Sequence, residues 1–88
     1  MCLRHEFIAL LLVHKALAND AANADANFQL GKLAVSRGDH AAAVPHFERA
    51  VEAAPTLKEA WYQLSLSYRS LGQQEKSRAA LEQFKALK

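Results

Sequence analysis

The sequence predicts an all-α fold, a stack of five antiparallel helices arranged as repeated pairs. The first observation behind this prediction is a step of 34 residues, which carries Leu30 to Leu64 and Gly38 to Gly72. The second is that apolar residues between the glycine turns recur three and four positions apart, which is the spacing of one face of a helix. A period of this length is typical of stacked helical repeats, so we expect neighbouring units to bury each other's apolar faces.

The composition fits one small folded domain and argues against several classes of protein. The chain has 88 residues, of which 51% are hydrophobic, and its formal charge of +2 is too small to indicate a nucleic-acid-binding surface. Cys2 is the only cysteine, so no internal disulfide is possible. No apolar run reaches the roughly 20 residues that a membrane-spanning helix needs. We therefore expect neither nucleic acid nor a membrane as a partner.

Residues 1–22 admit two interpretations. A basic start, an apolar run and the sequence Ala16-Leu17-Ala18 give residues 1–18 features of a signal peptide, although Glu6 and His14-Lys15 flank the run unfavourably. We favour a helix, because five apolar residues in this segment lie one period before five residues of the central unit. They are Ala9, Leu10, Val13, Ala16 and Leu17, which precede Ala43, Val44, Phe47, Ala50 and Val51. This helix is then the second helix of an incomplete repeat.

The second helix is expected to begin near Asn23 or Asp25, either of which can cap its free amides, and to run to about Arg37. Its buried stripe is expected to comprise Ala26 or Asn27, Leu30, Gly31, Leu33 and Ala34. Glycine in a helix interior costs roughly 1 kcal/mol relative to alanine, so Gly31 indicates a place where a neighbouring helix comes close. A solvent-exposed Leu30 would count against the stacked architecture.

Gly38-Asp39 is expected to end the second helix and to cap a third, which runs from about His40 to Ala54. Pro45 lies within the first two turns of the third helix, where it cannot donate an amide to Ala41, so we expect a loose or bent opening turn. The apolar stripe of this helix is Ala43, Val44, Phe47, Ala50, Val51 and Ala54.

Pro55-Thr56 break the chain before a fourth helix, which we expect from Lys58 to Leu71. Gly72-Gln73 repeat the earlier glycine turn and lead into a fifth helix, from Gln74 to Leu87. The expected buried stripes are Trp61, Leu64, Ser65, Tyr68 and Leu71 in the fourth helix and Ser77, Ala80, Leu81, Phe84 and Leu87 in the fifth.

These positions resemble the tetratricopeptide repeat, a helix-turn-helix unit with a characteristic set of Trp, Leu-Gly, Tyr, Ala, Phe and Pro. The central unit contains part of that set, namely Leu30-Gly31, Ala43, Phe47, Ala50 and Pro55. The last unit contains the complementary part, namely Trp61, Leu64 and Tyr68. Phe84 occupies a position where this family usually has a small residue, which predicts that the last unit shields its own open end.

The resemblance implies one right-handed α-solenoid domain over residues 1–88. Within it, residues 1–22 contribute the second helix of an incomplete repeat, residues 24–57 form a full repeat, and residues 58–88 form the last repeat. Repeat arrays bury their faces only by stacking, and fewer than about three units are usually marginal. We therefore expect either self-association or truncation from a longer array.

The resemblance also implies that the first helix of each unit lines a concave groove that binds proteins or peptides. The groove-facing positions here are Asp25, Phe28, Lys32, Val35, Ser36, Glu59, Tyr62, Leu66, Arg69 and Ser70. Six of them are the candidate binding residues, with an exposed apolar strip edged by two cations: Phe28, Val35, Tyr62 and Leu66, with Lys32 and Arg69. Such a strip fits an amphipathic helix or an extended peptide. Alternatively, Phe28 and Tyr62 pack against the helix of an adjoining unit or against a second copy of the chain.

A second candidate function is structural. The flank of the N-terminal helix and the outer face of Leu81, Phe84 and Leu87 lack neighbours in the predicted stack, so a homodimer could form through these open ends.

Enzymatic function is not expected, because a repeat array of this size offers an open surface rather than a pocket with converging groups. His40 and His46 lie six residues apart, which is not the spacing that lets one helix present both to a metal. We expect no cofactor and no metal. The expected location is cytoplasmic, or periplasmic or secreted if residues 1–18 are a signal peptide.

Overall fold

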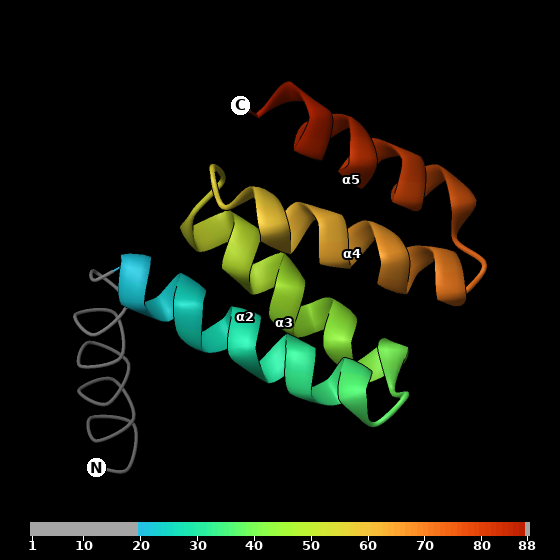
Figure 1. Cartoon of the computed structure of the whole chain (residues 1–88), viewed down its shortest axis with the longest axis horizontal. Helices are drawn as coiled ribbons and strands as arrows, with labels where there is room; N and C mark the ends of the chain where they lie inside the picture. The colour runs from blue at the N-terminus through green and yellow to red at the C-terminus, as the bar shows by residue number, and fades with distance from the viewer. Residues whose placement is uncertain (1–19, 88) are drawn as a thin grey trace, which may run out of the picture.

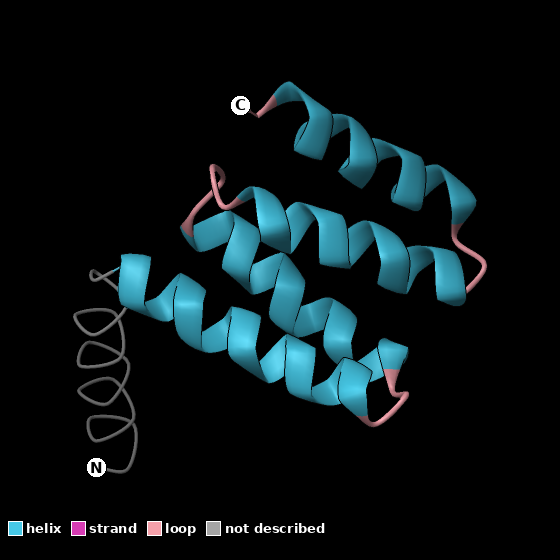
Figure 2. Ribbon diagram, in the orientation of Figure 1, coloured by secondary structure: helices cyan, strands magenta, loops and turns pink. Residues whose placement is uncertain are grey.

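The computed structural model describes residues 20–87, which form four helices in an antiparallel stack (Figure 1). They are α2 (Asp20–Ser36), α3 (His40–Ala53), α4 (Lys58–Ser70) and α5 (Gln74–Ala86). Short loops join them, and no strand occurs within residues 20–87 (Figure 2). The all-α prediction is confirmed for this part of the chain. The first of the five expected helices, in residues 1–22, lies outside the described residues apart from its last three positions, which belong to α2.

The step of 34 residues is visible in the backbone. Helix α4 spans residues 58–70, which are residues 24–36 of α2 advanced by 34, and α5 follows α3 by the same step. The turns also correspond, since Gly38 and Gly72 adopt φ angles of 75° and 77°, a left-handed conformation that favours glycine. In each turn the next amide donates back to the helix, from Asp39 to the Ala34 carbonyl (2.9 Å) and from Gln73 to the Tyr68 carbonyl (2.8 Å). These bonds satisfy carbonyls that a helix end leaves free.

The start of α3 confirms the expected cap. The Asp39 carboxylate accepts a hydrogen bond from the Ala42 amide at 3.1 Å, which satisfies one of the free donors of the first turn. Helix α3 continues through Pro45 to Ala53, so the proline is tolerated near the helix start.

The expected start of α2 was wrong. Helix α2 begins at Asp20 rather than at Asn23 or Asp25, and is longer than α4 by one turn.

One hydrophobic core joins the two repeats. Phe47 of α3 is fully buried at its centre, and the core includes residues of all four helices. Its buried members are Phe28, Ala43, Phe47, Ala50, Val51, Ala60, Leu64, Tyr68 and Ala80, with Trp61 packed against them. The stripes predicted for α3 and α4 therefore meet as expected, except that Leu71 is 39% exposed. In α5 only Ala80 is buried, because within residues 20–87 this helix has a neighbour on one side only.

The predicted burial of Leu30 was wrong. Leu30 and Leu33 are each 48% exposed, whereas Leu64, one period after Leu30, is 2% exposed. The stacked architecture stands nevertheless, because Phe47 and Trp61 pack in the same core and the helix bounds repeat with the sequence. Leu30 is exposed because the helix pair α2 and α3 has a described neighbour on its α4 side only. Leu64 is covered by α3, and residues 20–87 provide no counterpart of α3 for Leu30.

Gly31 marks the close approach that its place in the helix predicted. A Cβ atom at this position would lie 2.5 Å from Cε1 of the Phe47 ring, which is inside the contact distance of two carbon atoms. In the second repeat the position equivalent to Gly31 is Ser65, which is buried, and the position equivalent to Phe47 is Leu81. Each repeat thus pairs a small residue on its first helix with a larger one on its second, and the larger Ser65 goes with the smaller Leu81.

We predict that Gly31→Ala destabilises the fold even though alanine favours helices. The added methyl group meets a fully buried ring, and overpacking of this kind costs about 1–3 kcal/mol, more than the roughly 1 kcal/mol that alanine gains in a helix. Chemical denaturation of both proteins measures the difference.

The control is Gln29→Ala, an exposed change on the same helix, which should alter stability by less than about 0.5 kcal/mol. Gly31→Ser with Phe47→Leu, which copies the second repeat, should be more stable than Gly31→Ser alone. Equal stability of Gly31→Ala and the parent chain would contradict the close contact.

Candidate functional site

The predicted binding surface combines side chains of α2 and α4, the first helices of the two pairs, which contact one another directly. Lys32 and Arg69 are exposed, and Val35 and Leu66 are half-buried. Tyr62 is 41% exposed. These five candidates therefore reach the surface, whereas Phe28 does not.

The expected exposure of Phe28 was wrong. This side chain is 7% exposed, and its ring centroid lies 5.9 Å from that of Phe47 in a tilted arrangement. The Lys32 ammonium lies 5.2 Å from the centre of the Phe28 ring, a distance at which a cation is attracted to an aromatic face. Phe28 thus belongs to the core of its own repeat, and Lys32 partly covers it. The alternative interpretation, in which Phe28 packs against an adjoining unit or a second copy, does not describe this contact either, because Phe47 belongs to the same repeat as Phe28.

Tyr62, one period after Phe28, also contacts an aromatic ring of the following helix, but one turn further along that helix, and it remains more exposed. Its ring centroid lies 5.1 Å from that of Phe84 of α5. The Lys58 ammonium lies 5.5 Å from the Phe84 ring centre, so the two aromatic rings and the cation form one cluster. The repeat places an aromatic side chain of the first helix against one of the second in both units. Comparing Phe28 with Tyr62 and searching for partners on the following helix could have found this arrangement from sequence.

The remaining candidates follow a regular pattern. Lys32 and Leu66 are separated by 34 residues, and so are Val35 and Arg69. Each first helix therefore presents one apolar and one cationic side chain, in opposite order along the two helices. The resulting surface alternates apolar and positive groups in two directions, which is a more specific chemical pattern than an aromatic strip.

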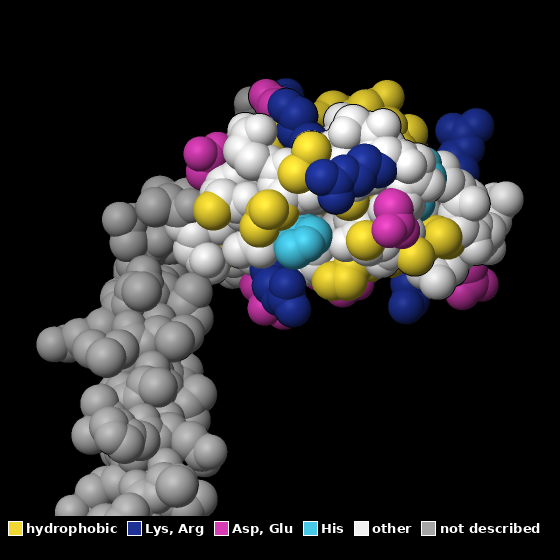
Figure 3. Space-filling model, turned by 90° about the horizontal axis from the view of Figure 1, so that it is seen from below, with side chains coloured by type: hydrophobic (Ala, Val, Ile, Leu, Met, Phe, Trp, Pro, Cys, Tyr) yellow, Lys and Arg dark blue, Asp and Glu magenta, His cyan; other side chains and the backbone are white. Residues whose placement is uncertain are grey.

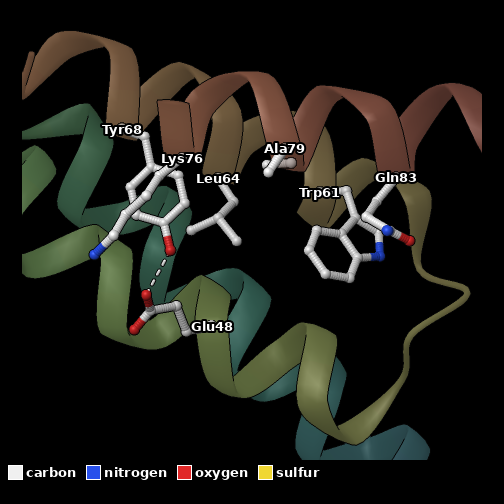
Figure 4. Close-up of a pocket in the computed structure, with 8 residues that line it drawn as sticks. Glu48, Trp61, Leu64, Tyr68, Lys76, Ala79 and Gln83 are labelled. Carbon is white, nitrogen blue, oxygen red and sulfur yellow. Dashed lines mark hydrogen bonds between the residues drawn. The ribbon is translucent and has the colours of Figure 1, made fainter. Parts of the chain in front are cut away.

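The sequence did not predict a groove that lies elsewhere on the molecule. A groove of about 400 Å³ runs over α4 between α3 and α5 (Figure 4). It is lined by Glu48, Trp61, Leu64, Tyr68, Lys76, Ala79, Ala80 and Gln83. At one end the Tyr68 hydroxyl donates to the Glu48 carboxylate at 2.5 Å, and the Lys76 ammonium lies 5.8 Å from the Tyr68 ring centre. At the other end the Trp61 indole nitrogen donates to the Pro55 carbonyl at 2.8 Å.

The acid-base equilibrium of the Tyr68 phenol is strongly perturbed. Burial raises the pKa of the Tyr68 phenol well above its ordinary value of about 10, and the hydrogen bond and the negative charge of Glu48 raise it further. The neutral hydroxyl is therefore kept as a hydrogen-bond donor between the two repeats. The Glu48 carboxylate accepts this bond, so the pair joins α3 of the first repeat to α4 of the second.

Residues 20–87 contain no cluster of three His, Cys, Asp or Glu side chains placed to hold a metal ion. His40 and His46 do not converge, since the His40 Nδ1 atom lies 3.3 Å from the Ser67 hydroxyl on α4. None of the helices in this part of the chain combines the length and apolar content needed to cross a membrane.

Comparison with known protein families agrees with the geometry. Two family models described as tetratricopeptide repeat match the chain, one over residues 24–65 and the other over residues 58–88. The chain belongs to the tetratricopeptide repeat family. No curated protein matches the chain significantly. Tetratricopeptide repeats generally mediate protein–protein interaction and are typically non-catalytic scaffolds.

Membership in the family makes the two surfaces comparable. The surface of α2 and α4 belongs to the first helices of the two tetratricopeptide repeats, and the groove over α4 lies between the two second helices. The groove is closed at one end by the bond between Tyr68 and Glu48, which links successive repeats. The surface of α2 and α4 carries the alternating pattern of cations and apolar side chains.

We predict that Tyr68 ionises at a higher pH than an exposed tyrosine. Tyr62→Phe leaves Tyr68 as the only tyrosine, so the ultraviolet absorbance of tyrosinate then reports this residue alone. Because the raised pKa favours the neutral form in the folded chain, its contribution to stability is complete below about pH 10 and is lost as the pH rises further.

The matched variant is Tyr62→Phe with Glu48→Gln, which removes the negative charge and should lower the midpoint of the Tyr68 titration. A midpoint at the ordinary tyrosine pKa while the chain is still folded by circular dichroism would contradict the burial of this hydroxyl.

Proposed function

We propose that this tetratricopeptide repeat protein is a binding module that holds a peptide or a partner helix on the surface of α2 and α4. The residues that contact the partner in this proposal are Lys32, Val35, Tyr62, Leu66 and Arg69. The observation that carries the proposal is the register of Lys32 with Leu66 and of Val35 with Arg69, which produces an ordered pattern on adjacent first helices. A helix face that only contacts solvent does not require a fixed order of apolar and charged residues.

The chemistry of this surface indicates the kind of partner. Val35 and Leu66 are half-buried and offer contact area to apolar side chains, and the neighbouring ring of Tyr62 enlarges it. Lys32 and Arg69 are exposed at opposite corners of the pattern, where carboxylates of a bound segment can reach them. A segment that alternates acidic and apolar residues fits this pattern, and we propose a partner of that kind. An enzymatic role forms no part of the proposal.

The alternative is a structural unit that forms a homodimer through its open ends. The exposed Leu30 and Leu33 at the α2 end are the observation that favours it. Neither residue belongs to the partner surface. Variants of the two surfaces therefore separate a binding module from a self-assembling unit.

Selection of a displayed peptide library against the full chain tests the proposal. We expect enrichment of peptides that carry Asp or Glu beside apolar residues. Lys32→Glu with Arg69→Glu should weaken binding of a selected peptide about tenfold or more, since each lost charge contact at an exposed site contributes up to about 1 kcal/mol and reversal adds repulsion. Isothermal titration calorimetry measures the affinities.

The matched control is Arg78→Glu with Lys85→Glu, which reverses two exposed charges on α5 and should leave the affinity within about twofold. Sedimentation of the same variants should show an unchanged mass. Selected peptides whose binding is indifferent to Lys32 and Arg69 would overturn the proposed surface.

A further inference from the structure

The outer face of α2 is built like a face that another helix covers. The comparison is with α4, whose equivalent face packs against α3. Leu30 is 48% exposed and its counterpart Leu64 2%, and Leu33 is 48% exposed whereas its counterpart Ser67 is fully buried. Ala26 is likewise exposed, whereas Ala60, one period later, is fully buried. Two large apolar side chains and one small one thus occupy positions that are covered in the second repeat.

Figure 3 views the molecule from the side of α2 and α3. Hydrophobic side chains reach the surface at several places on this side, with Lys or Arg and His side chains among them. The exposed leucines of α2 occupy the positions that are buried in α4. Apolar residues scattered singly over a surface would not repeat the pattern of that buried face, so the pattern indicates a specific contact. The missing partner is therefore a counterpart of α3.

The chain itself contains a segment of the required pattern. In α3 the residues that form the buried stripe are Ala43, Val44, Phe47, Ala50 and Val51. One period earlier the sequence has Ala9, Leu10, Val13, Ala16 and Leu17, in which every position remains apolar and both alanines are retained. We infer that residues 7–18 of this chain dock as a helix on the Leu30 and Leu33 face of α2.

The length of the connection agrees with this inference. Helix α3 ends at Ala53 and α4 begins at Lys58, so residues 54–57 make the link between two stacked repeats. Their counterparts are residues 20–23, the additional first turn by which α2 exceeds α4. In the docked arrangement this turn opens to form the link, and α2 begins at Ala24. No residue has to be inserted or removed.

Asn23 is placed to accommodate that change. It occupies the position just before residue 24, and asparagine is among the residues preferred as the cap of a helix start. In the structure its side-chain oxygen accepts a hydrogen bond from the side-chain amide of Asn27 at 3.2 Å, and its backbone carbonyl accepts another from the same group at 3.0 Å. When α2 starts at Ala24, the same side-chain oxygen can accept from a free backbone amide of the first turn instead.

Hydrogen exchange of the full chain, followed by NMR, tests the inference. The mass of the purified protein first establishes that residues 1–19 are present. Amides of residues 10–17 should then exchange at least about a hundredfold more slowly than in an unstructured peptide, because a docked helix exchanges only through opening. Leu30→Asp should remove at least tenfold of that protection.

The control is Leu71→Asp, which replaces a comparably exposed leucine away from α2 and should leave protection of residues 10–17 within about twofold. Protection of α4 and α5 shows whether each variant is folded, and Leu33→Gln serves as the milder variant if Leu30→Asp unfolds the chain.

Three results overturn the inference. Unprotected amides in residues 10–17 mean that the segment does not dock. Protection that disappears on dilution means that a second copy of the chain covers α2. Protection that both Leu30→Asp and Leu33→Gln leave unchanged means that the segment is helical but packs elsewhere.

Discussion

The packing of the Phe47 ring is the contact on which the rest of the structure depends. The ring is fully buried, it lies over Gly31 of α2, and it meets the Phe28 ring in a tilted arrangement. The absence of a side chain at Gly31 lets α2 and α3 approach closely enough for this. On the other side α3 covers Leu64 and Tyr68 of α4, so one helix connects the two repeats. Removing the volume of the ring would leave a cavity at the point where all three helices meet, which is costly in a domain of this size.

The sequence predicts the helices well because their limits are local. Gly38 and Gly72 adopt the left-handed conformation that ends each first helix, and Asp39 supplies a cap within four residues of its bonding partner. The 34-residue step predicts which helices are neighbours. The step predicts the buried residues of α3 and α4 correctly because each of these helices has a neighbouring helix on both sides.

The errors arise where a prediction needed information about neighbours rather than about periodicity. Leu30 and Leu64 are both leucines at equivalent positions, and their exposure differs only because a helix covers Leu64 and none of the described helices covers Leu30. Phe28 was assigned to the binding surface from its position on the helix, whereas its partner Phe47 draws it inward. Leu71 follows the last turn of α4, where the helical stripe no longer applies. Of the candidate surface, the exposed cations were predictable, because long charged side chains stay hydrated wherever the backbone permits.

The hydrogen bond from Trp61 to Pro55 has a practical consequence. Trp61 is the only tryptophan of the chain, and it lies beside the link between the two repeats, against the core that they share. Its fluorescence therefore comes from the junction and not from the interior of either unit. If the two units lose their mutual packing before their helices melt, emission and circular dichroism will diverge, and the chain carries its own optical probe for cooperativity between repeats.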